Sequence, residues 1–210
     1  MSIDGTDFPE TLSGTLGDDV INALGGNDII YGSQGNDTVY GGDGTDRLIF
    51  TLSDTSLFAA AFGARTFTIG AGTVTDSGAT INTSFSSVEN ITLSTVGAGN
   101  FADIIDASGF TTILGTGVTI LLGDGDASVT GSTKNDIITT GRGDNVINSG
   151  AGQDTINASQ GHDFIDGGAV RDTLIATMGN ASLFAAATGS RTYTISNTGI
   201  SDSSGTLDTG

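Results

Sequence analysis

The sequence predicts an all-β fold, a parallel β-roll (a β-solenoid) that is interrupted by β-rich spacer segments. Three observations predict it: glycine recurs every nine residues, aspartate follows two places after each glycine, and a large apolar residue lies two places after each aspartate. A short period that persists along a chain is typical of stacked structural repeats. The first glycine–aspartate pairs are Gly17 and Asp19, Gly26 and Asp28, Gly35 and Asp37, and Gly44 and Asp46.

The first block of repeats occupies residues 1–49. Its regular copies follow the pattern G-G-x-G-x-D-x-U-x, in which U is a large apolar residue. A degenerate copy at residues 5–13 precedes them, with Glu10 in the aspartate position. The regular copies span residues 14–22, 23–31, 32–40 and 41–49, and their apolar residues are Ile21, Ile30, Val39 and Leu48.

A second block of six nonapeptides occupies residues 122–175 and keeps the apolar position. It departs from the pattern at four places. Ala127 and Asn145 replace the aspartate, and Lys134 and Val170 replace the fourth glycine. We therefore expect these turns to be weaker versions of the regular ones.

The turn G-G-x-G-x-D suits a hard cation. Its glycines adopt backbone angles that other residues avoid, so several carbonyl oxygens can point toward one place. The aspartate adds a charged oxygen, which suits Ca²⁺ with its roughly six to eight oxygen ligands. The chain has no cysteine and a single histidine, His162, so zinc and iron centres lack ligands.

Each turn is followed by x-U-x, a three-residue strand whose central side chain points to one face. Two nonapeptides then make one coil of eighteen residues, and successive coils stack at about 4.8 Å. Each ion would lie between two stacked turns, whose sixth residues are eighteen apart. The predicted pairs are Asp19 with Asp37, Asp28 with Asp46, Asp136 with Asp154, Asn145 with Asp163, and Asp154 with Asp172.

These nonapeptides resemble the calcium-binding repeats of the RTX family, the secreted repeat proteins of the haemolysin type. The resemblance implies several Ca²⁺ ions in the turns of a β-roll, with carbonyls of the first four residues of each turn as further ligands. It also implies type I secretion from a Gram-negative bacterium, with the folded protein outside the cell or at its surface. The glycines that it implicates are Gly17, Gly26, Gly35, Gly42, Gly44, Gly143, Gly152 and Gly161.

The spacer, residues 50–121, is expected to form strands, because it alternates polar and apolar residues and is rich in β-branched types. Only residues 56–62, which are alanine-rich and begin with Ser56, favour a helical turn with a serine N-cap. Residues 1–84 align without a gap on residues 127–210, so 176–210 begins a second copy of the spacer. The displacement of 126 is seven times eighteen, which predicts that successive modules continue one solenoid in phase, unless the spacer stacks separately as a sandwich.

The formal net charge of −18 arises from 24 acidic and 6 basic residues. Carboxylates in the turns repel one another until a cation binds, so the chain should stay expanded without calcium. The excess of acidic residues argues against nucleic acid as a partner. No apolar stretch reaches membrane-spanning length, and the first ten residues lack the features of a cleavable signal.

We expect a calcium-dependent extracellular structural module, such as a stalk, surface layer, filament or adhesin segment. Its expected partners are further copies stacked end to end and a cell surface or matrix. The alternative is a non-catalytic secretion and folding module of a type I-secreted enzyme or toxin. We expect no enzyme activity, since no hydrolase or metalloprotease motif is present and His162 occupies a variable turn position. Arg142, Gly143 and Asp144 spell an integrin-type tripeptide that the repeat itself explains.

Overall fold

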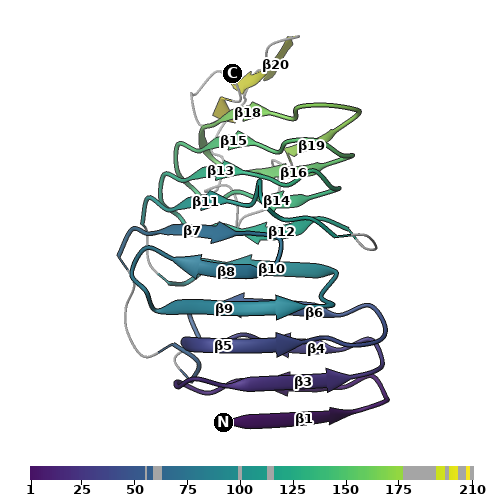
Figure 1. The fold of residues 1–210 in the computed structure, drawn as a ribbon. Coiled ribbons are helices and arrows are strands. Elements are labelled where there is room, and N and C mark those ends of the chain that lie inside the picture. The colour runs from purple at the N-terminus through teal and green to yellow at the C-terminus, as the bar shows by residue number, and fades with distance from the viewer. Residues whose placement is uncertain are drawn as a thin grey trace.

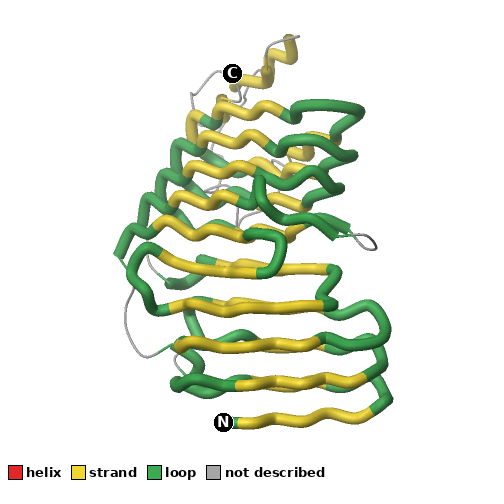
Figure 2. The backbone as a smooth tube through the Cα atoms, viewed as in Figure 1, coloured by secondary structure: helices red, strands yellow, loops and turns green. Residues whose placement is uncertain are grey.

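The computed structural model describes residues 1–54, 56–58, 63–98, 101–112, 116–176, 193–196, 199–202 and 207–208, with side chains described up to residue 175. Within these residues the chain forms strands, turns and loops, which confirms the all-β prediction. The same residues contain no helix of the length and apolarity that crossing a membrane requires. Figures 1 and 2 show the strands stacked in two layers, with β1 at one end of the stack.

The first layer is a ten-stranded sheet. In spatial order its strands are β1 (Ser2–Thr6), β3 (Val20–Leu24), β5 (Gly35–Tyr40), β9 (Ile81–Ser86), β8 (Thr73–Asp76), β7 (Thr66–Ile69), β11 (Ile104–Asp106), β13 (Ser128–Thr130), β15 (Val146–Asn148) and β18 (Phe164–Asp166).

The second layer is an eight-stranded sheet, and a four-stranded sheet lies near the C-terminal part of the chain. The eight strands are β19 (Thr173–Ala176), β16 (Thr155–Ala158), β14 (Ile137–Thr139), β12 (Val118–Leu121), β10 (Asn90–Ser94), β6 (Arg47–Thr51), β4 (Ile29–Tyr31) and β2 (Thr11–Ser13). The four are β17 (Gly161–His162), β22 (Leu207–Asp208), β21 (Gly199–Asp202) and β20 (Tyr193–Ser196).

The register within both blocks confirms a coil of eighteen residues. Ile21 lies opposite Val39 in the ten-stranded sheet, and Ile30 lies opposite Leu48 in the eight-stranded sheet. These strands are parallel, because the chain returns to the same sheet in the same direction after each full coil. The apolar residues of the four regular nonapeptides in the first block are buried in the core and are at most 1% exposed.

The spacer does not form a separate sandwich, because its strands join both sheets. β9 pairs with β5, and β10 pairs with β6, so the core continues from the first block. The spacer's rungs are not equal coils of eighteen, however. β7, β8 and β9 are joined antiparallel, which places two more strands in one sheet than in the other. The stack is therefore continuous through the spacer, as the in-phase displacement of 126 residues predicts, although its rungs differ in length.

The spacer also shifts the apolar column of the eight-stranded sheet by two residues. Leu48 lies opposite Ile91, which lies opposite Val118. The apolar residues of the second block instead continue a neighbouring column that Phe50 begins. Its members are Phe50, Leu93, Ile120, Ile138 and Ile156. All five are at most 1% exposed, so both columns contribute to one core.

The predicted helical turn at residues 56–62 is described only as far as residue 58. There the cap is Asp54 rather than Ser56. The Asp54 carboxylate accepts hydrogen bonds from the backbone amide and hydroxyl of Ser56, and its carbonyl accepts one from the amide of Phe58. The copy that begins at Ser182 lies outside the described residues.

Candidate metal centre

The sixth residue of nearly every repeat is buried at a turn between the two sheets. The aspartates at this position are at most 3% exposed, apart from Asp172, which is half-buried. A buried carboxylate without compensation is costly, so its partners decide what the turn can do. The fully buried members are Asp19, Asp28, Asp37, Asp46, Asp136, Asp154 and Asp163, together with Asn145.

In each of these side chains except Asp19, one oxygen accepts a hydrogen bond from a backbone amide of the preceding coil. The backbone amide of Asp19 donates to Asp37 Oδ1 at 3.0 Å, and the amide of Asp28 donates to Asp46 Oδ1 at 2.8 Å. The same bond joins the other predicted pairs, from Asp136 to Asp154, from Asn145 to Asp163 and from Asp154 to Asp172. The predicted pairs are therefore stacked one above the other, joined by a ladder of hydrogen bonds.

The second carboxylate oxygen is left without a hydrogen bond in several turns. Such oxygens, buried and unpartnered, belong to Asp19 (Oδ1) and to Asp28, Asp46, Asp154 and Asp163 (all Oδ2). The Asp19 oxygen lies 3.2 Å from the N-terminal ammonium group. Leaving a buried acceptor unsatisfied costs about 1–3 kcal/mol, and more when the group is charged. A bound cation would remove that cost, so these residues fit Ca²⁺.

Burial also raises the pKa of several of these carboxyls. It raises the pKa of Asp37, Asp136 and Asp163 to about 6, and the pKa values of Asp46 and Asp154 in the same direction. Negative charges on the neighbouring coils add to the effect. Ionised carboxylates in these turns therefore need a positive charge close by.

The glycines let the turns stack closely. Gly44 has a φ of +134°, and a Cβ at that position would overlap the carbonyl oxygen of Gly26 on the neighbouring coil. Gly161 has the same relation to the carbonyl oxygen of Gly143. Two of the predicted glycines, Gly17 and Gly143, do not have a positive φ. The predicted glycines that do are Gly26, Gly35, Gly42, Gly44, Gly152 and Gly161.

Two turns satisfy their own carboxylate through a serine at the second position. The Ser33 hydroxyl donates to Asp37 Oδ2 at 3.0 Å. The Ser132 amide donates to Asp136 Oδ2 at 2.6 Å, and its hydroxyl donates to Oδ1 at 2.7 Å. These carboxylates keep no unpartnered oxygen, so Asp37 and Asp136 are less in need of a cation than Asp28 or Asp154.

Asn145 differs from every aspartate at this position because its side chain also donates. Its amide nitrogen lies 2.9 Å from the carbonyl oxygen of Gly143, 3.3 Å from that of Gly141 and 2.9 Å from Asp163 Oδ1. These are carbonyls of the turn itself, which elsewhere would face an ion. The NH₂ group thus stands on the side of the turn that a cation would use.

Comparison with protein families matches four copies of the RTX calcium-binding nonapeptide repeat in two overlapping pairs, at residues 4–39 and 25–50 and at residues 122–156 and 143–174. The chain contains RTX calcium-binding nonapeptide repeats. The matches cover both blocks and leave most of the spacer outside. RTX repeats imply calcium binding, and they are typical of secreted proteins. A search of curated proteins finds no match to the chain.

The RTX turns carry a second ladder that the sequence pattern did not predict. Side-chain oxygens at the exposed fifth position accept the backbone amide of the fifth residue one coil later. Asp18 accepts from Asn36 at 2.9 Å, and Asp144 accepts from His162 at 2.8 Å. The same bond joins Asn27 to the amide of Thr45, Asp126 to the amide of Asp144, and Asn135 to the amide of Gln153. The sequence carried a sign of this ladder, because Asp and Asn occur often at the fifth position of the repeats.

No group of three or more His, Cys, Asp or Glu side chains placed to hold a metal ion occurs among the described residues. An ion in an RTX turn of this chain would therefore depend on backbone carbonyls beside one or two carboxylates.

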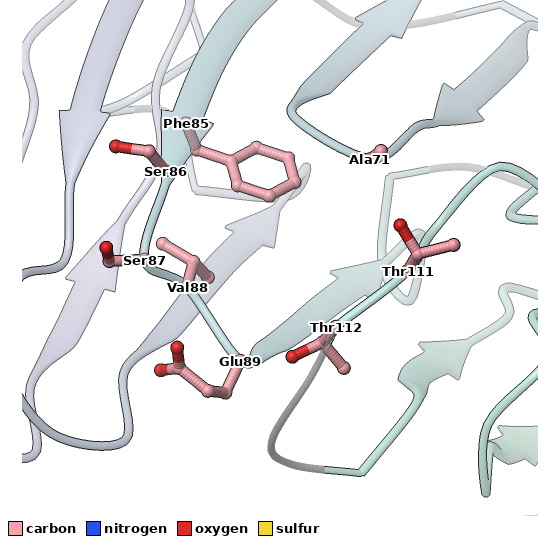
Figure 3. Close-up of a pocket in the computed structure, with 8 residues that line it drawn as sticks. All are labelled: Ala71, Phe85, Ser86, Ser87, Val88, Glu89, Thr111 and Thr112. Atoms are coloured by element: carbon pink, nitrogen blue, oxygen red, sulfur yellow. The ribbon is translucent and has the colours of Figure 1, made fainter.

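A separate cavity of about 370 Å³ lies in the spacer (Figure 3). Among the described residues, its lining includes Phe85, Thr111 and Thr112, with Glu89 as the single ionisable side chain.

Proposed function

We propose that this chain is a calcium-dependent extracellular structural module that folds when it binds Ca²⁺ after secretion. The observation that supports this most is the set of buried carboxylate oxygens without partners, stacked at the turns of the roll. No positively charged side chain compensates Asp28, Asp46, Asp154 or Asp163 in the ion pairs of the described residues. Hard oxygen ligands of this kind favour Ca²⁺ over softer metals.

The proposed ligands are the sixth-position carboxylates and the carbonyls of the turns that face them. Four pairs of turns are proposed to hold ions, those of Asp19 with Asp37, Asp28 with Asp46, Asp136 with Asp154, and Asp154 with Asp172. Asp163 remains a proposed ligand through its unpartnered Oδ2. Asn145 does not, because its amide group already donates to the turn carbonyls.

Folding would be coupled to location. Extracellular calcium modules bind in the range of about 10⁻⁴–10⁻³ M, far above the calcium concentration of a cytosol. The chain would therefore stay expanded inside the cell, where its acidic turns repel one another, and would fold outside. RTX repeat domains are generally non-catalytic, which agrees with a mechanical or spacing role.

The structural role proposed is that of a stalk, surface layer, filament or adhesin segment. A stack of parallel strands is stiff along its axis, and the edge strands of a solenoid present hydrogen-bonding groups to a further module. We include end-to-end association at a cell surface or in a matrix in the proposal. Electron microscopy after calcium addition tests it, since strictly single particles would exclude filaments.

Calcium titration followed by far-ultraviolet circular dichroism tests the proposed function. We expect a weak, disordered spectrum in excess chelator and a cooperative gain of β-sheet signal as calcium is added. Chelator should reverse the change, and magnesium at the same concentration should not reproduce it. A full β-sheet spectrum in excess chelator would refute the proposal.

A further inference from the structure

The spacer contains a turn that occupies the place of a further repeat, although its sequence lacks the glycine pattern. Asn90 lies opposite Arg47 and Ile91 lies opposite Leu48, so Glu89 falls opposite Asp46. Glu89 therefore holds the sixth position of the next coil. It lies 43 residues after Asp46 instead of eighteen, and it lies outside the residues matched by the RTX repeat.

Glu89 makes the contact that an aspartate makes in a regular turn. The backbone amide of Asp46 donates to Glu89 Oε2 at 2.8 Å, and the amide of Glu89 donates to the Asp46 carbonyl at 3.1 Å. The ladder at this edge of the roll thus runs from Glu10 through Asp28 and Asp46 to Glu89, with one bond at each step.

Ser87 supplies the second feature of a regular turn. It has a left-handed φ of +53°, an angle that in the repeats is mostly taken by glycine. A Cβ on Gly41 would overlap the Ser87 carbonyl oxygen and would lie 2.6 Å from Asp46 Oδ2. The two oxygens therefore converge on one point beside Gly41.

The same arrangement recurs in a regular turn of the second block. A Cβ on Gly131 would overlap the carbonyl oxygen of Ser149 and would lie 2.6 Å from Asp136 Oδ2. Ser87 thus reproduces, from the spacer, the carbonyl that Ser149 presents within the RTX repeats. In Figure 3 the side chains of Ser87 and Glu89 extend to one side of this segment, away from Thr111 and Thr112.

An unpartnered acceptor points to a ligand here. Asp46 is fully buried, and its Oδ2 has no hydrogen bond. In the second block the matching oxygen of Asp136 is satisfied by Ser132, whereas no serine stands at the second position of the Asp46 turn, which is Gly42. Asp46 Oδ2 therefore lacks the hydrogen bond that Asp136 Oδ2 receives from Ser132.

We propose that Ser87 and Glu89 form a cryptic turn that binds Ca²⁺ together with the turn of residues 41–46. Asp46 Oδ2, the Glu89 carboxylate and the Ser87 carbonyl are the ligands from this chain. This proposal rests on the proposed function, since it assumes that the regular turns bind calcium. Its consequence is that an ion ties the spacer to the first block, so that calcium orders the strand pairs β5–β9 and β6–β10 at the junction.

Counting bound ions in matched variants tests the proposal. Glu89→Gln removes the charge but keeps an oxygen for the Asp46 amide, and Asp4→Asn makes the same charge change on an exposed residue of strand β1, outside every turn proposed to bind an ion. By native mass spectrometry in saturating calcium, we expect Glu89→Gln to bind one ion fewer than the unaltered chain and Asp4→Asn to bind the same number. Equal numbers in all three proteins would overturn the cryptic site, whereas no bound calcium in any of them would instead overturn the proposed function.

Hydrogen exchange on the unaltered chain tests the site even if Glu89→Gln does not fold. Calcium should slow exchange in residues 86–90 together with residues 41–46, by at least about tenfold if the ion bridges them. Protection of the regular turns without any calcium effect on residues 86–90 would refute the cryptic site.

Discussion

Asp46 Oδ1 accepts a hydrogen bond of 2.8 Å from the backbone amide of Asp28, eighteen residues earlier. The same carboxylate keeps its other oxygen buried and without a partner. One side chain thus joins two coils through one oxygen and leaves its other oxygen buried beside Gly41. The backbone ladder explains how the turns are held in register, and the remaining oxygen is the reason we propose a cation at the turns.

Asn145→Asp should convert a calcium-independent turn into a calcium-binding one. The substitution removes the donor that satisfies the carbonyls of Gly141 and Gly143 and places a carboxylate against them. At a calcium concentration that folds the chain but leaves the new site empty, we expect the variant to be about 1–3 kcal/mol less stable than the unaltered chain. In saturating calcium it should bind one more ion than the unaltered chain, as measured by native mass spectrometry.

Asn135→Asp is the matched control for this prediction. Asn135 is at the fifth position, and its side-chain oxygen accepts from the backbone amide of Gln153. Asp144 makes the same contact with His162, so aspartate is compatible with this position. The control should leave both stability and ion number unchanged. An unchanged ion number in Asn145→Asp would contradict the role assigned to the Asn145 amide.

Stability should depend on pH in opposite directions with and without calcium. Burial raises the pKa of Asp37, Asp136 and Asp163 to about 6, from 3.8 in the unfolded chain. Without calcium the folded state therefore binds protons more tightly than the unfolded state does. Its stability should be greatest below about pH 3.8 and should fall as the pH rises through about 6.

With calcium the same carboxyls are held ionised, so protons compete with the ion and acidification should weaken the fold. Circular dichroism between about pH 7 and pH 4 distinguishes the two regimes. In chelator the β-sheet signal should grow on acidification, and at limiting calcium it should shrink. Parallel curves in the two conditions would be inconsistent with carboxylates as ligands.

Gly44→Ala should destabilise the roll through its backbone rather than through its charge. Gly44 has a φ of +134°, and the added methyl group would overlap the carbonyl oxygen of Gly26. A strained angle and a steric clash together cost about 3 kcal/mol or more. Urea unfolding in saturating calcium should show the loss as a lower midpoint.

Gly17→Ala is the matched comparison, because Gly17 holds the same fourth position. It has no left-handed angle, and a Cβ there would meet no atom within 4 Å. The unfolding midpoint of this variant should stay close to that of the unaltered chain. Equal losses in the two variants would show that stacking of the turns does not depend on the backbone of Gly44.

The sequence was sufficient to predict the repeating part of the fold. A nine-residue period with one inward apolar residue leaves few arrangements other than an eighteen-residue coil, and Ile21 opposite Val39 confirms it. The stacking of Asp28 under Asp46 follows from the same period. The ions between such pairs stay a prediction that the chemistry of the turns supports.

The spacer strands and the roles of Glu89 and Asn145 depend on tertiary contacts, which the nine-residue period of the sequence does not predict. The antiparallel β7–β8–β9 segment has no counterpart in the repeats, so the unequal sheets could not be foreseen from a displacement of 126 residues. Glu89 lies at the wrong spacing to be recognised as a sixth-position residue. Asn145 has the right spacing, but only its hydrogen bonds reveal that it donates where an aspartate would accept.

The unfolding free energy as a function of free calcium tests the central claim most directly. If ions bind only the folded roll, each tenfold rise in calcium above the dissociation constant adds about 1.4 kcal/mol per ion. Urea unfolding across a series of calcium buffers should therefore give a slope equivalent to several ions. An unfolding free energy that is the same in chelator and in millimolar calcium would contradict the account.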